Sequence, residues 1–227
     1  MNKQAVKKWG TLLLLSAGAG IIFQLPYIRE TFYVPIQKAM DLTNAQMGML
    51  SSGYATMATF SYFVGGVVAD KFSARKLLTV SFLATGVLGW WFSTFPGFQI
   101  SRIIFILMGI STIITYWSAA IKATRDSSEQ GRLFGWQEGL RGLLNALLVF
   151  GMTAVYSRFS NEILGTTWAI RVCAITVFII GILNWFVIED TAAETHTEPL
   201  SKIVIGVFKT LKMPRTWVLV AIVFFAY

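Results

Sequence analysis

Long apolar stretches separated by short polar loops dominate the pattern of this chain. A helix that crosses a membrane needs about 20 mostly apolar residues. Six stretches approach or exceed that length, approximately at residues 11–37, 45–69, 77–95, 98–121, 132–157 and 165–188. A seventh apolar stretch begins near Thr216 and runs to Tyr227. The pattern predicts an all-α membrane protein, with a bundle of six transmembrane helices followed by the start of a seventh.

The polar segments between these stretches predict how the chain is divided. Residues 189–199 are acidic and rich in threonine, and from 200 to 212 apolar residues recur at helical spacing opposite lysines. That second pattern predicts an amphipathic helix on a membrane surface. We therefore expect a six-helix bundle at 1–188, a cytoplasmic linker with its surface helix at 189–213, and the start of helix seven at 214–227. Between the first two stretches, Thr43 and Gln46 have the spacing of a capping box, which predicts a helix start.

Composition supports a membrane protein and excludes several other classes. Of the 227 residues, 55% are hydrophobic and 13% charged, whereas a soluble domain has about 25% charged residues. The net charge of +8 is spread between apolar stretches, and a nucleic-acid-binding protein would gather it on one face. The single Cys173 excludes an internal disulfide, and no spacing of metal ligands is present. We expect no metal, no cofactor and no nucleic-acid partner.

The basic residues also predict an orientation. Cytoplasmic loops carry an excess of Lys and Arg, and alternate loops contain Lys3, Lys7, Lys8, Lys71, Arg75, Lys76, Lys122, Arg125, Arg132, Lys202, Lys209, Lys212 and Arg215. The opposite side has only Arg29, Lys38, Arg102, Arg158 and Arg171. This bias predicts a cytoplasmic N-terminus. A signal peptide also begins with basic residues, but here the apolar stretch continues past residue 20, so we expect the first helix to be retained.

A motif at residues 65–76 resembles the loop between the second and third helices of the major facilitator superfamily. That loop is written G-x-x-x-D-[RK]-x-G-x-[RK]-[RK], and the matching residues are Gly66, Asp70, Lys71, Arg75 and Lys76. Ser73 stands where the second glycine is usual. The resemblance implies two six-helix halves that expose a central site alternately, with Asp70 and Arg75 as part of a cytoplasmic gate. It also implies a C-terminal six-helix half as a partner. The alternative is an ordinary basic loop after a transmembrane helix.

Ionisable residues near the end of the first stretch suggest an anion site. Tyr27, Arg29 and Glu30 fall inside the helix expected at 11–37, and charged groups inside a membrane usually face a bundle interior or a watery cavity. The segment resembles the end of the first helix in organophosphate:phosphate antiporters, where an arginine binds phosphate. Glu30 departs from that pattern, and it could neutralise Arg29 or carry a coupling proton. Alternatively, the helix ends earlier and Arg29 reaches the outer interface.

The fifth stretch has a polar stripe of its own. Gln137, Glu138, Arg141 and Asn145 recur at helical spacing, so Glu138 and Arg141 are expected to pair inside the membrane. Such a pair serves a substrate or proton, or it holds helices in register. Glycines at 131, 135 and 139 form a small-xxx-small pattern, which predicts close packing against another helix.

Residues of the second and fourth stretches narrow the expected class of ligand. Antiporters of the phosphate branch often have a lysine where Tyr62 stands, and its absence favours a monoanion such as a carboxylate or sugar acid. In the fourth stretch, Ser111, Thr115, Ser118 and Lys122 are expected on one face. Trp117 followed by Lys122 loosely matches a tryptophan and basic residue of the family.

These observations lead to one main hypothesis. It is a secondary transporter of a small organic anion, such as a sugar acid, carboxylate or sugar phosphate, in a bacterial inner membrane and coupled to a proton, sodium ion or phosphate. The expected substrate-binding residues are Arg29, Arg141, Tyr27, Tyr62, Trp117 and Asn145, and Glu30 and Glu138 are the expected proton carriers or ion-pair partners. The alternative is a membrane sensor or assembly subunit with the same fold. An enzyme is not expected, because neither a Gly-x-Ser-x-Gly elbow nor paired intramembrane aspartates occur.

Overall fold

The computed structural model describes residues 3–117, 130–188 and 212–226, and these residues are mostly helical. The chain divides into two units, Met1–Ala193 and Glu194–Tyr227. The predicted linker and surface helix, up to residue 211, lie outside the described residues.

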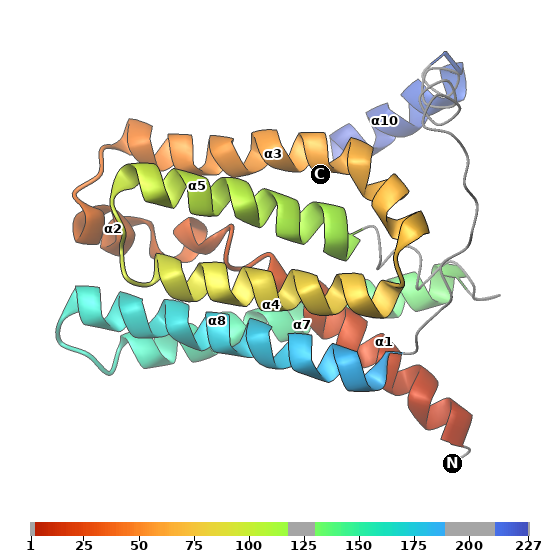
Figure 1. The fold of residues 1–227 in the computed structure, drawn as a ribbon, viewed down its shortest axis with the longest axis horizontal. Helices are drawn as coiled ribbons and strands as arrows, with labels where there is room; N and C mark the ends of the chain where they lie inside the picture. The colour runs from red at the N-terminus through yellow and green to blue at the C-terminus, as the bar shows by residue number, and fades with distance from the viewer. Residues whose placement is uncertain (1–2, 118–129, 189–211, 227) are drawn as a thin grey trace. The chain divides into compact units, whose positions relative to one another are not determined.

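The described residues of the first unit form eight helical elements, and Figure 1 labels each of them except the π-helix η1. They are α1 (Lys3–Ile22), α2 (Ile28–Met40), α3 (Asn44–Lys71), α4 (Ala74–Phe92), α5 (Phe98–Gly109), the π-helix η1 (Ile110–Trp117), α7 (Gln130–Tyr156) and α8 (Glu162–Val187). Helices lie at each apolar stretch that the sequence pattern picks out, and the described residues of this unit contain no strand.

The first apolar stretch is not the continuous helix predicted at 11–37. It breaks at residues 23–27, so Tyr27 lies in a turn and Arg29 lies in the first turn of α2. Pro26 explains the break because it has no N–H that could donate a helical hydrogen bond to the carbonyl of Ile22. Its ring also clashes with a preceding turn of helix. One side-chain hydrogen bond crosses the break, from Gln24 Nε2 to Thr31 Oγ1 at 3.1 Å.

Beyond the break, α2 bends and then stops. Phe32 has non-helical angles (φ −124°, ψ 41°), three residues before Pro35. The capping box expected at Thr43 is confirmed: the Gln46 N–H donates to Thr43 Oγ1 at 3.2 Å, and the Thr43 N–H donates to Gln46 Oε1 at 2.9 Å. This cap fixes where α3 begins.

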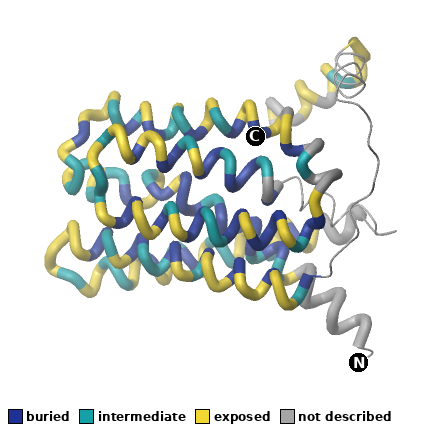
Figure 2. The backbone as a smooth tube through the Cα atoms, viewed as in Figure 1, coloured by how far each residue is buried: buried dark blue, intermediate teal, exposed yellow. Residues whose placement is uncertain are grey.

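Helix packing in the first unit is organised in neighbouring pairs. α4 makes its largest contact with α8, α3 packs against α5 and η1, and α1 packs against α7 (Figure 1). Buried and exposed positions alternate along the long helices (Figure 2), so each has one face toward the core. Between α4 and α8 the backbones come close, because a Cβ added at Gly86 would lie 3.1 Å from the carbonyl oxygen of Ala174.

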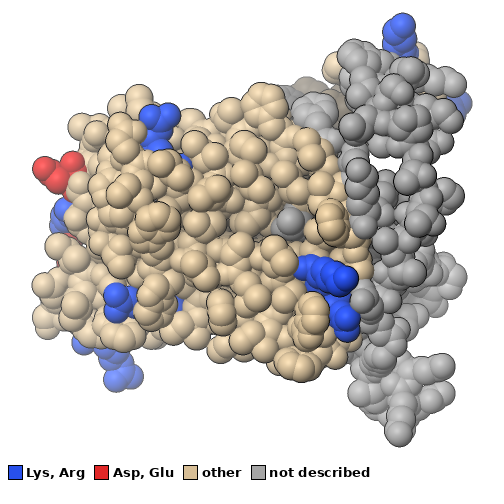
Figure 3. Space-filling view, in the orientation of Figure 1, with Lys and Arg blue, Asp and Glu red and all other residues tan. Residues whose placement is uncertain are grey.

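These helices differ in whether their hydropathy and length would allow them to cross a membrane. Within the described residues, Gly135–Tyr156 and Glu162–Val187 are long and apolar enough to cross a membrane by length and composition, whereas Leu13–Ile22 and Phe98–Ile114 are shorter apolar segments. The count of six spans therefore stays a prediction. Lys and Arg atoms in Figure 3 lie toward the two ends of this helical unit, with uncharged residues between them.

A polar network holds η1 against α3 and α4. Thr112 Oγ1 donates to the carbonyl of Met108 at 2.7 Å and lies 3.2 Å from the hydroxyl of Tyr54. Ser111 Oγ and Thr85 Oγ1 are 2.7 Å apart, and Ser81 Oγ donates to the Ser111 carbonyl. These hydroxyls satisfy polar groups within an apolar core.

The second unit contains α10 (Pro214–Ala226) among its described residues. Its start agrees with the helix expected from the seventh apolar stretch. Pro214 occupies its first position, where the missing N–H costs no hydrogen bond. Its exposed side chains include Arg215 near the start and the apolar residues Trp217, Val218, Val220, Ile222 and Phe225.

Candidate functional site

The break between α1 and α2 positions the first group of candidate residues. Arg29 is partly buried and Glu30 is exposed, and both lie in the first turn of α2. A helix N-terminus carries partial positive charge from its unpaired N–H groups. Among the described residues, neither side chain has an oppositely charged partner within 4.0 Å. Glu30 therefore does not neutralise Arg29 in this structure.

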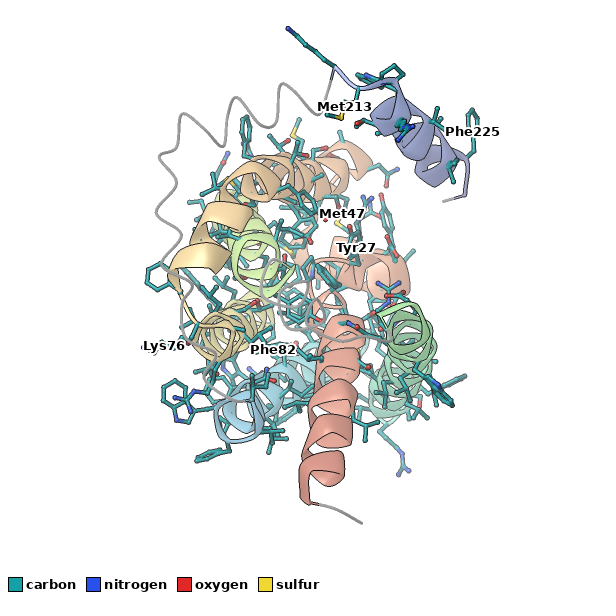
Figure 4. All side chains as sticks on the ribbon, turned by 90° about the vertical axis from the view of Figure 1, so that its right-hand side faces the viewer. Tyr27, Met47, Lys76, Phe82, Met213 and Phe225 are labelled. Atoms are coloured by element: carbon teal, nitrogen blue, oxygen red, sulfur yellow. The ribbon has the colours of Figure 1, made fainter. Side chains whose placement is uncertain are left out.

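A tyrosine from the break meets a tyrosine from α3. The rings of Tyr27 and Tyr54 meet edge to face, with centroids 5.6 Å apart. Tyr27 is 44% exposed and Tyr62 is 56% exposed. Figure 4 shows Tyr27 on the side of the unit where α2 and α7 lie. The structure thus pairs Tyr27 with Tyr54, a buried residue that the sequence pattern did not single out, and leaves Tyr62 as a further exposed tyrosine of α3.

The second group of candidates lies on α7. Glu138 Oε2 and Arg141 Nη2 are 2.8 Å apart, so the pair expected from their spacing forms. It is not buried, however, because the side chains are 47% and 33% exposed. Gly20 of α1 lies against the Arg141 backbone, where an added Cβ would be 2.5 Å from the carbonyl oxygen. This close approach fixes α7 beside α1.

Asn145 and Gln137 lie on either side of that pair in the sequence. Each has one side-chain oxygen that accepts no hydrogen bond from the described residues. Within the described residues, Asn145 Oδ1 and Gln137 Oε1 are buried and have no donor. Asn145 contacts α1, since its Cβ lies 3.3 Å from a Cβ added at Gly20. Both amides therefore lie at or near the α1–α7 packing, where an unpaired acceptor has a cost of about 1–3 kcal/mol.

The glycine ladder of α7 has no neighbouring helix in the described structure, so its predicted packing stays a prediction. A Cβ added at Gly135 or Gly139 would meet no atom within 4 Å in the described structure, and the side-chain environment of Gly131 lies outside the described residues. Close contacts of α7 are made instead by Gly20 of α1 and by Gly165 of α8. Gly135 and Gly139 line an open hollow of about 510 Å³ together with Trp136, Leu140 and Leu143.

The gating motif is only partly described. The side chains of Gly66, Asp70 and Lys71 lie outside the described residues, so the expected contact between Asp70 and Arg75 stays a prediction. Arg75 lies over the ring of Trp185 at 4.6 Å, and Lys76 is exposed.

Ser73, which replaces the usual glycine of the motif, has a clear role. It is the N-cap of α4, and its Oγ accepts from the Lys76 N–H at 3.4 Å. Its φ of −68° does not require glycine. A serine three residues before a helical amide is a sequence signal that could have revealed this cap.

The common polar face predicted for Ser111, Thr115, Ser118 and Lys122 stays a prediction, because Ser111 is the one member whose side chain is described. Ser111 is buried and bonded to α4. The π-helical turn of η1 changes the spacing that a regular helix would give. Trp117, expected to contact substrate, has no described side chain, and residues 118 and 122 lie outside the described structure. Within the described residues, no three His, Cys, Asp or Glu side chains gather as a metal site.

The described contacts do not join the two groups of candidates into a single cluster. Gly20 faces Arg141, whereas Arg29 comes nine residues later, after the break. On α3, Ser52, Thr56, Thr59 and Tyr62 are all exposed. The structure thus leaves polar and charged side chains of α2, α3 and α7 accessible.

Comparisons with known proteins agree on one family. The profile described as Major Facilitator Superfamily matches residues 9–227. The chain is 33% identical to inner membrane protein YqcE and 31% identical to inner membrane protein YihN, both of Escherichia coli (strain K12). These alignments cover 99% and 97% of this chain, and 54% of each relative.

A more distant relative is described as an uncharacterized protein, MG294 homolog, of Mycoplasma pneumoniae. It is 28% identical, over 75% of this chain and 39% of its own length. The chain thus spans about half the length of the two Escherichia coli relatives. No solved structure matches at a significant level.

Proposed function

Because the chain belongs to the Major Facilitator Superfamily, a family of membrane transporters, we propose that it forms the N-terminal six-helix half of a secondary transporter. Its cargo is a small organic anion, and the two halves expose it to each side of the membrane alternately. The proposal places the protein in a bacterial inner membrane with its N-terminus in the cytoplasm, as the distribution of basic residues predicts.

The interrupted first stretch is the observation that carries this proposal. Broken membrane helices in transporters direct half-helix N-termini at anionic groups of the substrate. Here the break at residues 23–27 puts Arg29 in the first turn of α2, next to the N-terminus of that helix. The partial charge of the helix end and the charge of the arginine add together. An arginine fork binds a carboxylate or phosphate through two parallel hydrogen bonds.

The charge balance of the accessible side supports a monoanion. Arg141 is paired with Glu138 at 2.8 Å, which leaves Arg29 as the unpaired arginine of this side among the described residues. Tyr62 adds no second cation. The exposed rings of Tyr27, two residues before Arg29, and of Tyr62 on α3 offer flat surfaces and hydroxyl groups. We propose a sugar acid or similar hydroxylated carboxylate as the cargo, in preference to a phosphate ester.

Coupling in this proposal uses a proton. Glu30 is exposed next to Arg29, so its carboxylate is available for protonation. Glu138 serves as the partner of Arg141 and loses that partner only when substrate competes for the guanidinium. Sodium or phosphate coupling is the alternative that the experiment below distinguishes.

The open face of α7 supports the presence of a second half. The hollow beside Gly135 and Gly139 is lined by Trp136, Leu140 and Leu143 and is accessible in this unit. Small residues let helix backbones approach closely in membranes. We propose that a helix of the C-terminal half packs here, and that Asp70 and Arg75 close the cytoplasmic side.

Uptake into proteoliposomes tests the function. The protein produced from its full reading frame is compared on a sugar acid, a sugar phosphate and a neutral sugar, with and without a proton gradient. We expect gradient-driven uptake of the acid. Arg29→Gln should lower that uptake by tenfold or more, because a charge-assisted pair contributes about 1.5–3 kcal/mol. Arg29→Lys should keep part of it.

The matched control is Arg158→Gln, which removes the same charge from an exposed turn. Its uptake should equal that of the unmodified protein. Full uptake by folded Arg29→Gln protein would remove Arg29 from the binding site. Exchange of the phosphate ester without any response to the gradient would replace proton coupling by antiport.

A further inference from the structure

Arg171 of α8 lies between two tryptophans at one end of the α4–α8 pair. Its Cζ atom is 5.0 Å from the ring centre of Trp90 and 5.2 Å from that of Trp168. Its Nε–H donates to Ser93 Oγ at 3.3 Å, and Ser93 Oγ donates in turn to the Trp90 carbonyl at 2.6 Å. The guanidinium is thus held by three residues from two helices.

The level of this cluster in the membrane follows from α4. This helix has 19 residues and is about 28 Å long at 1.5 Å per residue, close to the hydrocarbon thickness of about 30 Å. Ser93 is its C-cap, so if α4 is one of the six predicted spans, the Arg171 guanidinium lies near the boundary between hydrocarbon and headgroups. Trp90, Trp91 and Trp168 are 44%, 46% and 39% exposed at the same level. Tryptophan is enriched at that boundary because its ring is apolar and its N–H is polar.

Arg171 has hydrogen-bonding capacity beyond these contacts. Among the described residues, Nε–H is its one donor with an acceptor, and no carboxylate oxygen lies within 4.0 Å. The residue is only partly buried. An uncompensated cation is costly in hydrocarbon, but at the boundary it meets the phosphates of lipid headgroups.

We propose that Arg171, Trp90, Trp168 and Ser93 form a binding site for the phosphate of an anionic phospholipid. The free edge of the guanidinium binds phosphate oxygens as a fork, and the two exposed indoles pack along the glycerol and upper acyl chains. A headgroup with a positive amine is disfavoured because the amine would face the guanidinium. The site rests on the α4–α8 pair and does not depend on what the protein transports.

The opposite end of the same pair provides an internal contrast. There Arg75 of α4 lies over Trp185 of α8 at 4.6 Å, but Arg75 Nε is buried. A buried group of this kind braces helices, whereas the Arg171 cluster is open at its two tryptophans. The proposal therefore applies to the Arg171 end.

Thermal unfolding in lipid nanodiscs tests the site. The protein produced from its full reading frame is placed in phosphatidylcholine nanodiscs, and phosphatidylglycerol is titrated in. A ligand that binds the folded state raises the unfolding temperature, and the dependence on lipid fraction gives an apparent affinity. We expect Arg171→Gln to weaken that affinity about tenfold, because one charge-assisted fork is lost. Arg158→Gln, which removes the same charge from the turn before α8, should leave it unchanged.

Three outcomes would overturn the proposal. One is an Arg171→Gln protein that responds to phosphatidylglycerol as the unmodified protein does. Another is an equal loss in Arg158→Gln, which would indicate general charge attraction. The third is displacement of the lipid effect by soluble glycerol phosphate, which would indicate a site for free phosphate. If Arg171→Gln does not fold, Trp168→Leu keeps the guanidinium and removes one ring; an unchanged lipid response there would also overturn the proposal.

Discussion

α8 and α7 are both long enough to cross a membrane, yet they meet their surroundings differently. In the most apolar part of α8, 39% of the residues are buried, compared with 11% in α7. The mean hydropathy of these parts is 2.2 and 1.4. α8 packs against α4 with a close backbone approach at Gly86, whereas α7 has its close approach at Gly20 of α1 and leaves Gly135 and Gly139 uncovered.

The exposed side chains show what each helix faces. Those of α8 include Phe178, Ile179 and Leu183, which suit hydrocarbon. α7 also exposes apolar side chains, among them Leu143 and Phe150, but it exposes the ion pair of Glu138 and Arg141 as well. Charged groups inside membranes face a bundle interior or water rather than lipid. The comparison teaches that low burial need not have one cause: the exposed apolar residues of α8 suit lipid, and the ion pair on α7 is where we propose a site or partner surface.

The largest expected effect on stability comes from disrupting the packing between α4 and α8. Gly86→Leu should lower the free energy of unfolding by about 3 kcal/mol, because a leucine cannot fit where even a Cβ would lie 3.1 Å from Ala174 O and Phe178 Cβ. The measurement is thermal unfolding in detergent. Gly48→Leu is the matched control, since a Cβ at Gly48 would meet no atom within 4 Å in the described structure. Equal stability of both variants would contradict the close packing.

A smaller effect on stability is expected on α7, and it tests whether the ion pair there is accessible. Glu138→Gln breaks the pair with Arg141, and an accessible pair contributes only about 0.5 kcal/mol to folding. We expect a stability loss of that order, with a clear loss of substrate uptake in the same preparation. A loss of several kcal/mol would show that the pair is buried in the assembled protein and has a structural role.

The smallest expected effect on stability concerns the open hollow. In this chain without a second half, Gly139→Leu should change the free energy of unfolding by less than about 0.5 kcal/mol, because no described atom lies within 4 Å of the added Cβ. Uptake should nevertheless fall if a helix of the second half packs there. Normal uptake by this variant would show that the face meets lipid, as α8 does.

The positions of the helices could be predicted from the sequence because length and hydropathy determine them directly. The capping box at Thr43 is confirmed for a similar reason, since its partners are three residues apart. The sequence pattern did not predict the break at residues 23–27, although Pro26 lies within that segment. A proline within an apolar run bends a helix in some proteins and ends it in others, and the surrounding contacts decide.

The candidate site was harder to predict because it depends on which faces meet. The spacing of Glu138 and Arg141 predicted their contact but not its exposure. The glycines of α7 gave a packing signal, but the facing Gly20 makes the close approach. The Arg171 cluster joins residues 78 positions apart in sequence, so no local pattern could reveal it.

The π-helix η1 also affects how this chain tolerates insertions and deletions. Each π-turn contains one more residue than an α-turn, so the wider turn at Ile110–Trp117 rotates every later position of that helix relative to a regular α-helix. Removing one residue there would restore regular winding, and it would turn Ser111 and Thr112 away from Thr85 and Tyr54. Reading-frame-preserving deletions in this segment should therefore be far less tolerated than deletions in the turn at residues 157–161, where no helical phase has to be kept.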